Sequence, residues 1–160
     1  MSITWSFLKK YHLNPPTIML PREIDIQKKY DNFKKIIKNN NNNNIKNYIL
    51  TNFFKNNENI IFIKNNFPYD VESNIYHYVL WFNSNYCYLN KLNNLDKLNK
   101  NNYEKNILEN IKYFFDTKKI NDTTIDNYIF SNYEFIFFEN IKENKSINSI
   151  KHIHVFFKLK

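Results

Sequence analysis

The chain has 160 residues, enough for one domain with its own core, and it carries a formal net charge of +8. Its 15 Phe and 12 Tyr supply the apolar surface that a folded core needs, which excludes a wholly disordered protein. The single cysteine, Cys87, excludes an internal disulfide and a zinc site built from several cysteines, and no apolar run is long enough to span a membrane.

Residues 1–20 are predicted to be an N-terminal leader with a short helix that ends before Pro15-Pro16, and residues 21–160 to be a single domain. A helix is expected from Pro21, because proline suits the first helical turn and the apolar residues that follow have mostly helical spacing. The Asn-rich stretch 39–44 predicts a loop, after which a helix resumes over residues 45–56.

From residue 59 the pattern changes to β. Strands are expected over residues 59–64, 75–82, 134–138 and 150–159, with a polar loop over 83–101. A helix is expected over 103–119 and a short one over 123–130. Helices followed by the order β-β-α-β-β predict an α+β fold, with flanking helices and a mostly antiparallel sheet of four to five strands.

The last predicted strand carries two of the four histidines. Side chains alternate along a strand, so His152, His154 and Phe156 should project to one face and the apolar residues between and after them to the other. Two imidazoles on one face can bind phosphate, hold a metal, or act as nucleophile and base. A strand with two surface histidines and no site explains the pattern equally well.

Two further segments concentrate polar and aromatic side chains. One is Asn65–Asp70 followed by His77 and Trp81, and the other runs from Asn140 to Ser149. Because antiparallel strands lie side by side, we predict that both segments meet the histidine strand at one edge of the sheet. Asp70, Glu72 and the histidines at 77, 152 and 154 have no specific ligand spacing, so no metal site is predicted.

The motifs in these segments resemble an uncharacterised family typified by the fungal N-acetylglucosamine-induced protein and found in fungi, bacteria and large DNA viruses. The first is the turn Asn65-Asn66-Phe67-Pro68-Tyr69 with the strand His77–Trp81, although Asn66 stands where the family usually has Asp. The second is Phe137-Phe138-Glu139-Asn140, then Ser146 and His152-Ile153-His154-Val155, and a third is Leu20-Pro21-Arg22. The resemblance covers roughly residues 18–158 and implies a fold and a site, since the family has no established activity.

The chain is more loosely similar to the histidine-triad nucleotide hydrolases and transferases. Their last strand reads Ser/Thr-Val-x-His-x-His-x-His, which Ser149 to His154 matches, with Phe156 at the place of the third histidine. This resemblance implies a histidine-triad-like fold with His154 as covalent nucleophile on an α-phosphate. His152 and Ser149 would hold phosphate oxygens with support from Asn140, and residues 65–67 would lie near the ribose and base.

We therefore expect a nucleotide- or RNA 5′-end-binding protein with a His-x-His phosphate pocket, with phosphoanhydride hydrolase or nucleotidyl transferase chemistry left open. The missing third histidine and Asn66 favour binding without turnover, whereas the intact Ser149-x-x-His152-x-His154 run favours chemistry. The alternatives are a non-catalytic mRNA cap- or RNA-binding module, for example in viral translation or RNA metabolism, and a sugar-nucleotide-related metabolic protein. The candidate catalytic residues are His152 and His154, and the candidate ligand-binding residues are Arg22, Asn65, Asn66, Phe67, Tyr69, His77, Trp81, Asn140, Ser146 and Ser149.

Composition sets the remaining expectations. The chain lacks Gly and Ala, has one Arg, and uses Asn more than any other residue, which is typical of AT-rich genomes such as those of some large DNA viruses. Lysine is the default polar residue in such sequences, so the positive charge points only weakly to RNA. We expect a cytoplasmic protein (host cytoplasm if viral) with a nucleotide or RNA 5′ end as partner and no membrane partner; the cofactor is unknown, and a homodimer is one possible assembly.

Overall fold

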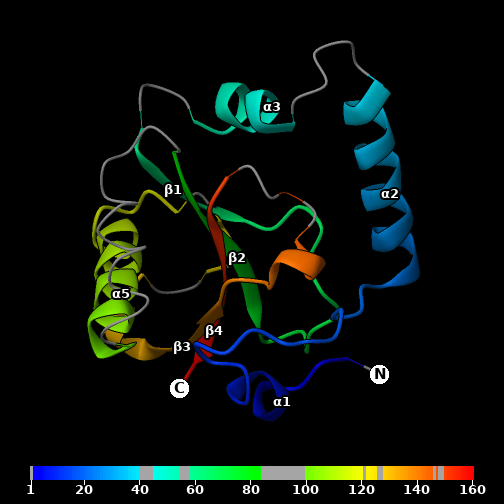
Figure 1. Ribbon diagram of the computed structural model, residues 1–160. Helices are drawn as coiled ribbons and strands as arrows, with labels where there is room; N and C mark the ends of the chain where they lie inside the picture. Colours follow the sequence, from blue (N-terminus) through cyan, green and yellow to red (C-terminus); the bar gives the residue numbers. More distant parts are fainter. Residues whose placement is uncertain are drawn as a thin grey trace.

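The described part of the chain is an α+β structure in which helices flank a central sheet (Figure 1). The computed structural model describes residues 2–39, 45–54, 58–83, 100–120, 122–125, 128–145, 147 and 150–160. None of the helices within these ranges is long and apolar enough to cross a lipid bilayer. The elements, in chain order, are α1 (Trp5–Lys9), α2 (Ile24–Asn39), α3 (Ile45–Asn52), β1 (Ile60–Lys64), β2 (Tyr76–Phe82), α5 (Lys100–Asp116), the 3-10 helix η1 (Phe130–Asn132), β3 (Tyr133–Phe138), the 3-10 helix η2 (Lys142–Asn144) and β4 (His152–Leu159).

The four strands form one sheet in the order β1-β2-β4-β3, and every neighbouring pair is antiparallel. The last strand in the chain, β4, therefore lies between β2 and β3. The register pairs His152 with Trp81 and His154 with both Val79 and Phe138. This confirms the predicted α+β fold and its antiparallel sheet, with strand limits that lie within two residues of those expected.

One face of the sheet packs against α5 to form the largest core cluster. Ile153, Val155 and Phe157 of β4 point to this face and are fully buried, as the alternation along the strand predicted. The residues of α5 that meet them recur at helical spacing, so one stripe of the helix covers the sheet. They are Ile107, Ile111, Phe114 and Phe115.

The opposite face, which carries His152, His154 and Phe156, is hereafter the histidine face. Two smaller clusters cover it: one includes α1 and Phe156, and the other includes Ile49 of α3 and Trp81 of β2. In Figure 1, α2 lies on the side of the sheet away from α5. The three helices α1, α2 and α3 thus surround a region of this face where polar side chains from several elements meet.

The N-terminal segment is anchored on this face by Trp5. Its indole Nε1–H donates to Glu134 Oε2 at 2.8 Å, and its backbone N–H donates to Glu72 Oε2 at 3.1 Å. Ile3, Leu8 and Leu20 are buried in the same cluster. The residues predicted to be a leader therefore contribute to the core.

Replacing Trp5 with Phe should lower the free energy of unfolding by about 1–2 kcal/mol, because a charge-assisted hydrogen bond and part of a packed ring are lost. Glu134→Gln is the matched control, since it keeps an acceptor for the indole and should cost less than about 1 kcal/mol. Urea unfolding at pH 7.5 measures both changes. A Trp5→Phe protein as stable as the wild type would show that the indole hydrogen bond contributes nothing.

The predicted helix over residues 123–130 is wrong for the described residues of that range. Thr123 and Thr124 form a turn, and the only helical structure there is the start of η1 at Phe130. Asp122 accepts hydrogen bonds from the backbone N–H and the hydroxyl of Thr124, which favours a local turn over a helix. Two other helices differ from the expected ranges: α5 begins at Lys100, before the expected residue 103, and α3 ends at Asn52, before the expected residue 56. Cys87 and most of the Asn-rich loop (40–44) lie outside the described residues.

Candidate functional site

The described parts of the segments singled out in the sequence meet at one cavity on the histidine face. The cavity lies over the inner strands β2 and β4, and not at an edge of the sheet as predicted. Nine of the twelve candidate site residues line it, and His77 lies next to it in contact with His154. Ser146 and Ser149 lie outside the described residues. The nine are Arg22, Asn65, Asn66, Phe67, Tyr69, Trp81, Asn140, His152 and His154.

The cavity is narrow and carries positive charge. The space between its lining atoms is about 890 Å³, including the part open to solvent, but only about 90 Å³ admits the centre of a water molecule. Arg22 and Lys64 are its charged side chains, and no Asp or Glu is among the described residues that line it. Such a slot suits a flat, uncharged ring with an anionic group near the cations.

The proton positions on His77 follow from a backbone donor. The N–H of Tyr69 donates to Nδ1 of His77 at 3.1 Å, so the neutral ring of His77 carries its proton on Nε2. That nitrogen lies 3.0 Å from Nδ1 of His154 and 3.2 Å from the amide nitrogen of Asn65. Because the amide nitrogen is a donor, the His77 proton goes to His154.

His154 therefore accepts at Nδ1 and carries its own proton on Nε2. The nitrogen Nε2 lies 3.1 Å from the amide of Asn140, which is also 3.0 Å from the hydroxyl of Tyr69. The backbone donor of Tyr69 is fixed, whereas the nitrogen and oxygen of an asparagine amide exchange places by a simple flip. We assign the Asn140 oxygen to this position, where it accepts the protons of His154 and Tyr69.

His152 has the opposite tautomer. Its Nδ1 lies 3.0 Å from the carbonyl oxygen of Ile150, which can only accept, so Nδ1 carries the proton. No hydrogen bond joins Nε2 to a described residue, and His152 lines the cavity although the residue is only 5% exposed. Of the three buried imidazoles, only His152 has a lone pair available at the cavity.

The buried imidazoles are neutral near pH 7. Burial lowers the pKa of His77 well below its ordinary value, and the charge of Arg22 lowers it further. Burial does the same to the pKa of His154, with smaller contributions from His77, His152 and Arg22. Burial also lowers the pKa of His152, against the hydrogen bond to Ile150.

The aromatic candidate residues Tyr69 and Trp81 are engaged by protein side chains. His152 stacks on Trp81 with ring centroids 4.6 Å apart, and Phe53 meets the same indole edge-on at 5.8 Å. Tyr69 stacks on His77 at 5.0 Å and also has the Arg22 guanidinium over its ring at 4.7 Å. Packing within the protein therefore accounts for the rings of Trp81 and Tyr69 in this structure.

Arg22, the single arginine of the chain, is held in place at the cavity. Its guanidinium lies over the rings of Tyr30 and Tyr69, at 4.4 and 4.7 Å. Its Nε–H donates to the carbonyl oxygen of Phe67 at 2.9 Å. Asn65 fixes the same turn, because its side-chain oxygen accepts the Phe67 N–H at 2.9 Å. Arg22 is thus a preorganised cation, and Asn65 holds the turn together.

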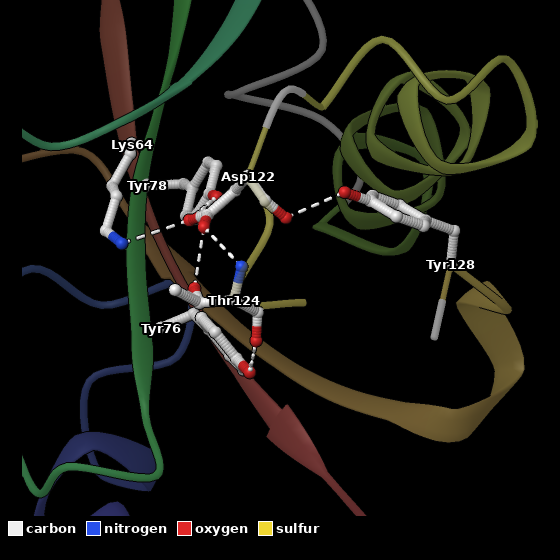
Figure 2. A network of polar contacts seen from close by, with 6 residues as sticks. All are labelled: Lys64, Tyr76, Tyr78, Asp122, Thr124 and Tyr128. Atoms are coloured by element: carbon white, nitrogen blue, oxygen red, sulfur yellow. Dashed lines mark hydrogen bonds and ion pairs between the residues drawn. The ribbon is translucent and has the colours of Figure 1, made fainter. Parts of the chain in front are cut away.

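Sequence reasoning missed a network that begins at Lys64, on the rim of the cavity (Figure 2). Lys64 pairs with the buried carboxylate of Asp122 at 3.1 Å, and the hydroxyl of Tyr78 donates to the same carboxylate oxygen. Tyr76 donates to the Thr124 carbonyl at 2.7 Å, and Tyr128 donates to the Asp122 carbonyl at 2.7 Å. In the sequence Asp122 directly precedes the helix expected over 123–130, where an Asp suits the N-cap, so nothing there pointed to this role.

The aromatic wall contributed by α2 was also missed as part of the site. Tyr30 and Phe33 line the cavity and contact Phe67, at centroid distances of 5.1 and 5.0 Å. Their spacing in the sequence had indicated only the helix expected from Pro21. Among the described residues, no three His, Cys, Asp or Glu side chains are grouped so that they could hold a metal ion. Glu72, one member of the metal set weighed from the sequence, accepts the Trp5 N–H at the start of α1.

Comparison with known proteins places this site within a family. No curated protein matches the chain. A solved structure, the crystal structure of HTC1, has a TM-score of 0.57 and 18% identity over 98% of this chain and 85% of that chain, so the likeness concerns the fold. The family model described as "Protein of unknown function (DUF3605)" matches residues 4–158, which include α1, the residues that line the cavity and all of β4 except Leu159. The chain therefore belongs to the DUF3605 family.

Proposed function

We propose that the chain binds a nucleotide, or the 5′ end of an RNA, in the cavity on the histidine face. The observation that carries the proposal is the lining, which combines a fixed guanidinium, aromatic walls and an imidazole acceptor with no acidic side chain among its described residues. A nucleotide needs a cation for its phosphates and flat apolar walls for its base. The looser resemblance to the histidine-triad nucleotide hydrolases and transferases supports the same ligand class.

Arg22 is the proposed phosphate ligand. Its planar fork keeps further N–H donors beyond the Nε–H that is bonded to Phe67, and a guanidinium fits phosphate oxygens better than a neutral imidazole does. His152 presents a lone pair and His154 has both nitrogens engaged, so neither offers a proton to a phosphate. In this proposal the phosphates lie toward Arg22 and the base lies deeper.

Binding without turnover is the function that this geometry favours. A covalent nucleophile needs a free lone pair, and Nε2 of His154 carries a proton that faces Asn140. Histidine-dependent phosphoryl or nucleotidyl transfer by His154 would first require that proton to move. A cap-binding module and a binder of nucleotide sugars share the same recognition chemistry, so the ligand panel below includes both.

Arg22→Gln should weaken binding of the best ligand by about 10- to 100-fold, which corresponds to the loss of a charged hydrogen bond worth about 1.5–3 kcal/mol. Calorimetry with nucleoside mono- and diphosphates, a methylated cap dinucleotide and a nucleotide sugar identifies that ligand. Phosphorus NMR of the same mixtures separates binding, which broadens resonances, from turnover, which creates new ones.

Lys28→Gln is the matched control, because it removes the same positive charge from an exposed position. Lys28 lies on α2, and its side chain is 70% exposed. This variant should keep wild-type affinity within about twofold at 0.15 M salt. Equal weakening by both substitutions would indicate a general effect of net charge. No binding across the panel would reject the proposed function.

A further inference from the structure

We infer that Nε2 of His152 is the hydrogen-bond acceptor that selects the ligand, and that the ligand presents an N–H group of a neutral heterocycle to it. The inference rests on the proposed function and specifies which part of a nucleotide enters the cavity. The base points inward with an N–H toward His152, and the phosphates remain near Arg22.

The first step is to decide whether Nε2 of His152 donates or accepts a hydrogen bond. The carbonyl of Ile150 fixes the proton on Nδ1, so Nε2 has a lone pair and no proton. A phosphate or carboxylate oxygen also presents lone pairs and would be repelled there. A ligand group that binds this nitrogen must therefore bring its own proton.

The second step is that His152 is held rigidly. It lies on the central strand β4 directly opposite Trp81 of β2, and its ring stacks on that indole. The hydrogen bond at Nδ1 sets the rotation of the ring. An acceptor fixed in this way binds without an ordering cost, which favours specificity for a donor in one direction.

The third step is that the charges nearby favour the neutral ring. Lys145 and Lys151 have side chains only 18% and 10% exposed, and both pair with the single carboxylate of Glu139. A proton on His152 would add a further buried positive charge near these lysines. The acceptor form of His152 therefore persists, and the donor comes from the ligand.

The fourth step excludes the neighbouring imidazoles as the selecting group. His77 accepts from the Tyr69 backbone and donates to His154, and His154 donates to Asn140. Both rings are closed into one hydrogen-bond chain that ends on Asn140 and Tyr69. They position Asn140 at the cavity wall, and His152 alone has capacity for a ligand.

Methylated nucleotides test the inference directly. Each of three parents, inosine, adenosine and uridine 5′-monophosphate, is paired with the methylated form that lacks its donor: 1-methylinosine, N6,N6-dimethyladenosine and 3-methyluridine monophosphate. Calorimetry should show that the parent that binds best loses at least tenfold in affinity on methylation. His152→Phe keeps an aromatic ring against Trp81 but has no acceptor. This variant should therefore bind the parent and its methylated form with the same weak affinity.

The methyl group also adds bulk, and the variant separates the two effects. Phenylalanine is no smaller than histidine, so a purely steric effect of methylation would persist in His152→Phe. Equal binding of parent and methylated forms to the wild type would overturn the inference and leave nucleotide binding in place. Absence of binding by all six compounds would overturn the inference together with the proposed function.

Nitrogen NMR of the ligand-free wild type tests the proton positions without any variant. The long-range 15N–1H spectrum of histidine-labelled protein should show His152 protonated at Nδ1 and both His77 and His154 protonated at Nε2. A spectrum with His152 protonated at Nε2 would overturn the inference, whatever the binding data show.

Discussion

Lowering the pH from 7.5 to 5.5 should destabilise the fold by about 3–4 kcal/mol, before most carboxylates begin to titrate. Burial lowers the pKa of His77, His152 and His154 below the ordinary value of 6.5. In the unfolded chain these groups take up protons as the pH falls below that value, whereas in the folded chain they stay neutral. The unfolded state then binds more protons, so stability is complete above about pH 6.5 and is lost as the pH falls toward the folded-state pKa values.

The slope of this loss reports how many imidazoles are buried and neutral. Each one contributes up to about 1.4 kcal/mol per pH unit, so three give about 4 kcal/mol per unit below pH 6.5. Urea unfolding at half-unit intervals between pH 7.5 and 5.5 measures it. In His152→Phe the slope should fall by about a third. A free energy of unfolding that does not change over this interval would mean that the native imidazoles are protonated or exposed.

Asp122→Ala should lower the free energy of unfolding by about 3 kcal/mol, far more than an ordinary surface substitution. The Asp122 carboxylate, 8% exposed, accepts from Tyr78 and Thr124 and pairs with Lys64. Its removal leaves the buried Tyr78 hydroxyl without this acceptor, which accounts for most of the cost. The Lys64 ion pair contributes little, because the Lys64 side chain is 58% exposed.

A double-mutant cycle separates the Tyr78 contribution. In a Tyr78→Phe background there is no hydroxyl to satisfy, so Asp122→Ala should cost about 1–2 kcal/mol less than in the wild type. Asp116→Ala is the control: Asp116 pairs with Lys112 on the outside of α5, its side chain is 51% exposed, and its loss should cost under about 0.5 kcal/mol. Additive losses for Asp122→Ala and Tyr78→Phe would contradict the network in Figure 2.

Asp122 should also make the fold sensitive to stronger acid. Burial alone would raise the pKa of Asp122, but the hydrogen bonds from Thr124, Tyr78 and Lys64 outweigh burial and lower it. The stabilisation from this group is therefore present above the ordinary pKa of 3.8 and is lost as the pH falls through the lower folded-state value. Below pH 4, the free energy of unfolding of Asp122→Asn should therefore depend less on pH than that of the wild type, as urea unfolding at several pH values would show.

The fold class could be predicted from the sequence, because it depends on local periodicity. The meeting of the site segments also needs β2 to lie beside β4, which the strand order of the sheet supplies. The alternation along β4 separates Ile153 and Val155 from His152 and His154, and antiparallel pairing brings β2 beside β4. The proton positions could not be predicted, since they depend on the Tyr69 N–H and the Ile150 carbonyl, which are placed by the tertiary structure. The stacking of His152 on Trp81 depends likewise on strand register, which no local pattern specifies.

The central place of β4 has a consequence for how the protein is made. Among the described strands, β3 pairs only with β4, and β2 pairs with β1 on one side and with β4 on the other. Without residues 152–159, the only strand pair left in the described sheet is β1 with β2. During synthesis from the N-terminus, the aromatic residues that cover both faces emerge before the strand that joins them. These apolar segments therefore stay without their strand partner until β4 has been made, and exposed apolar segments of this kind favour aggregation.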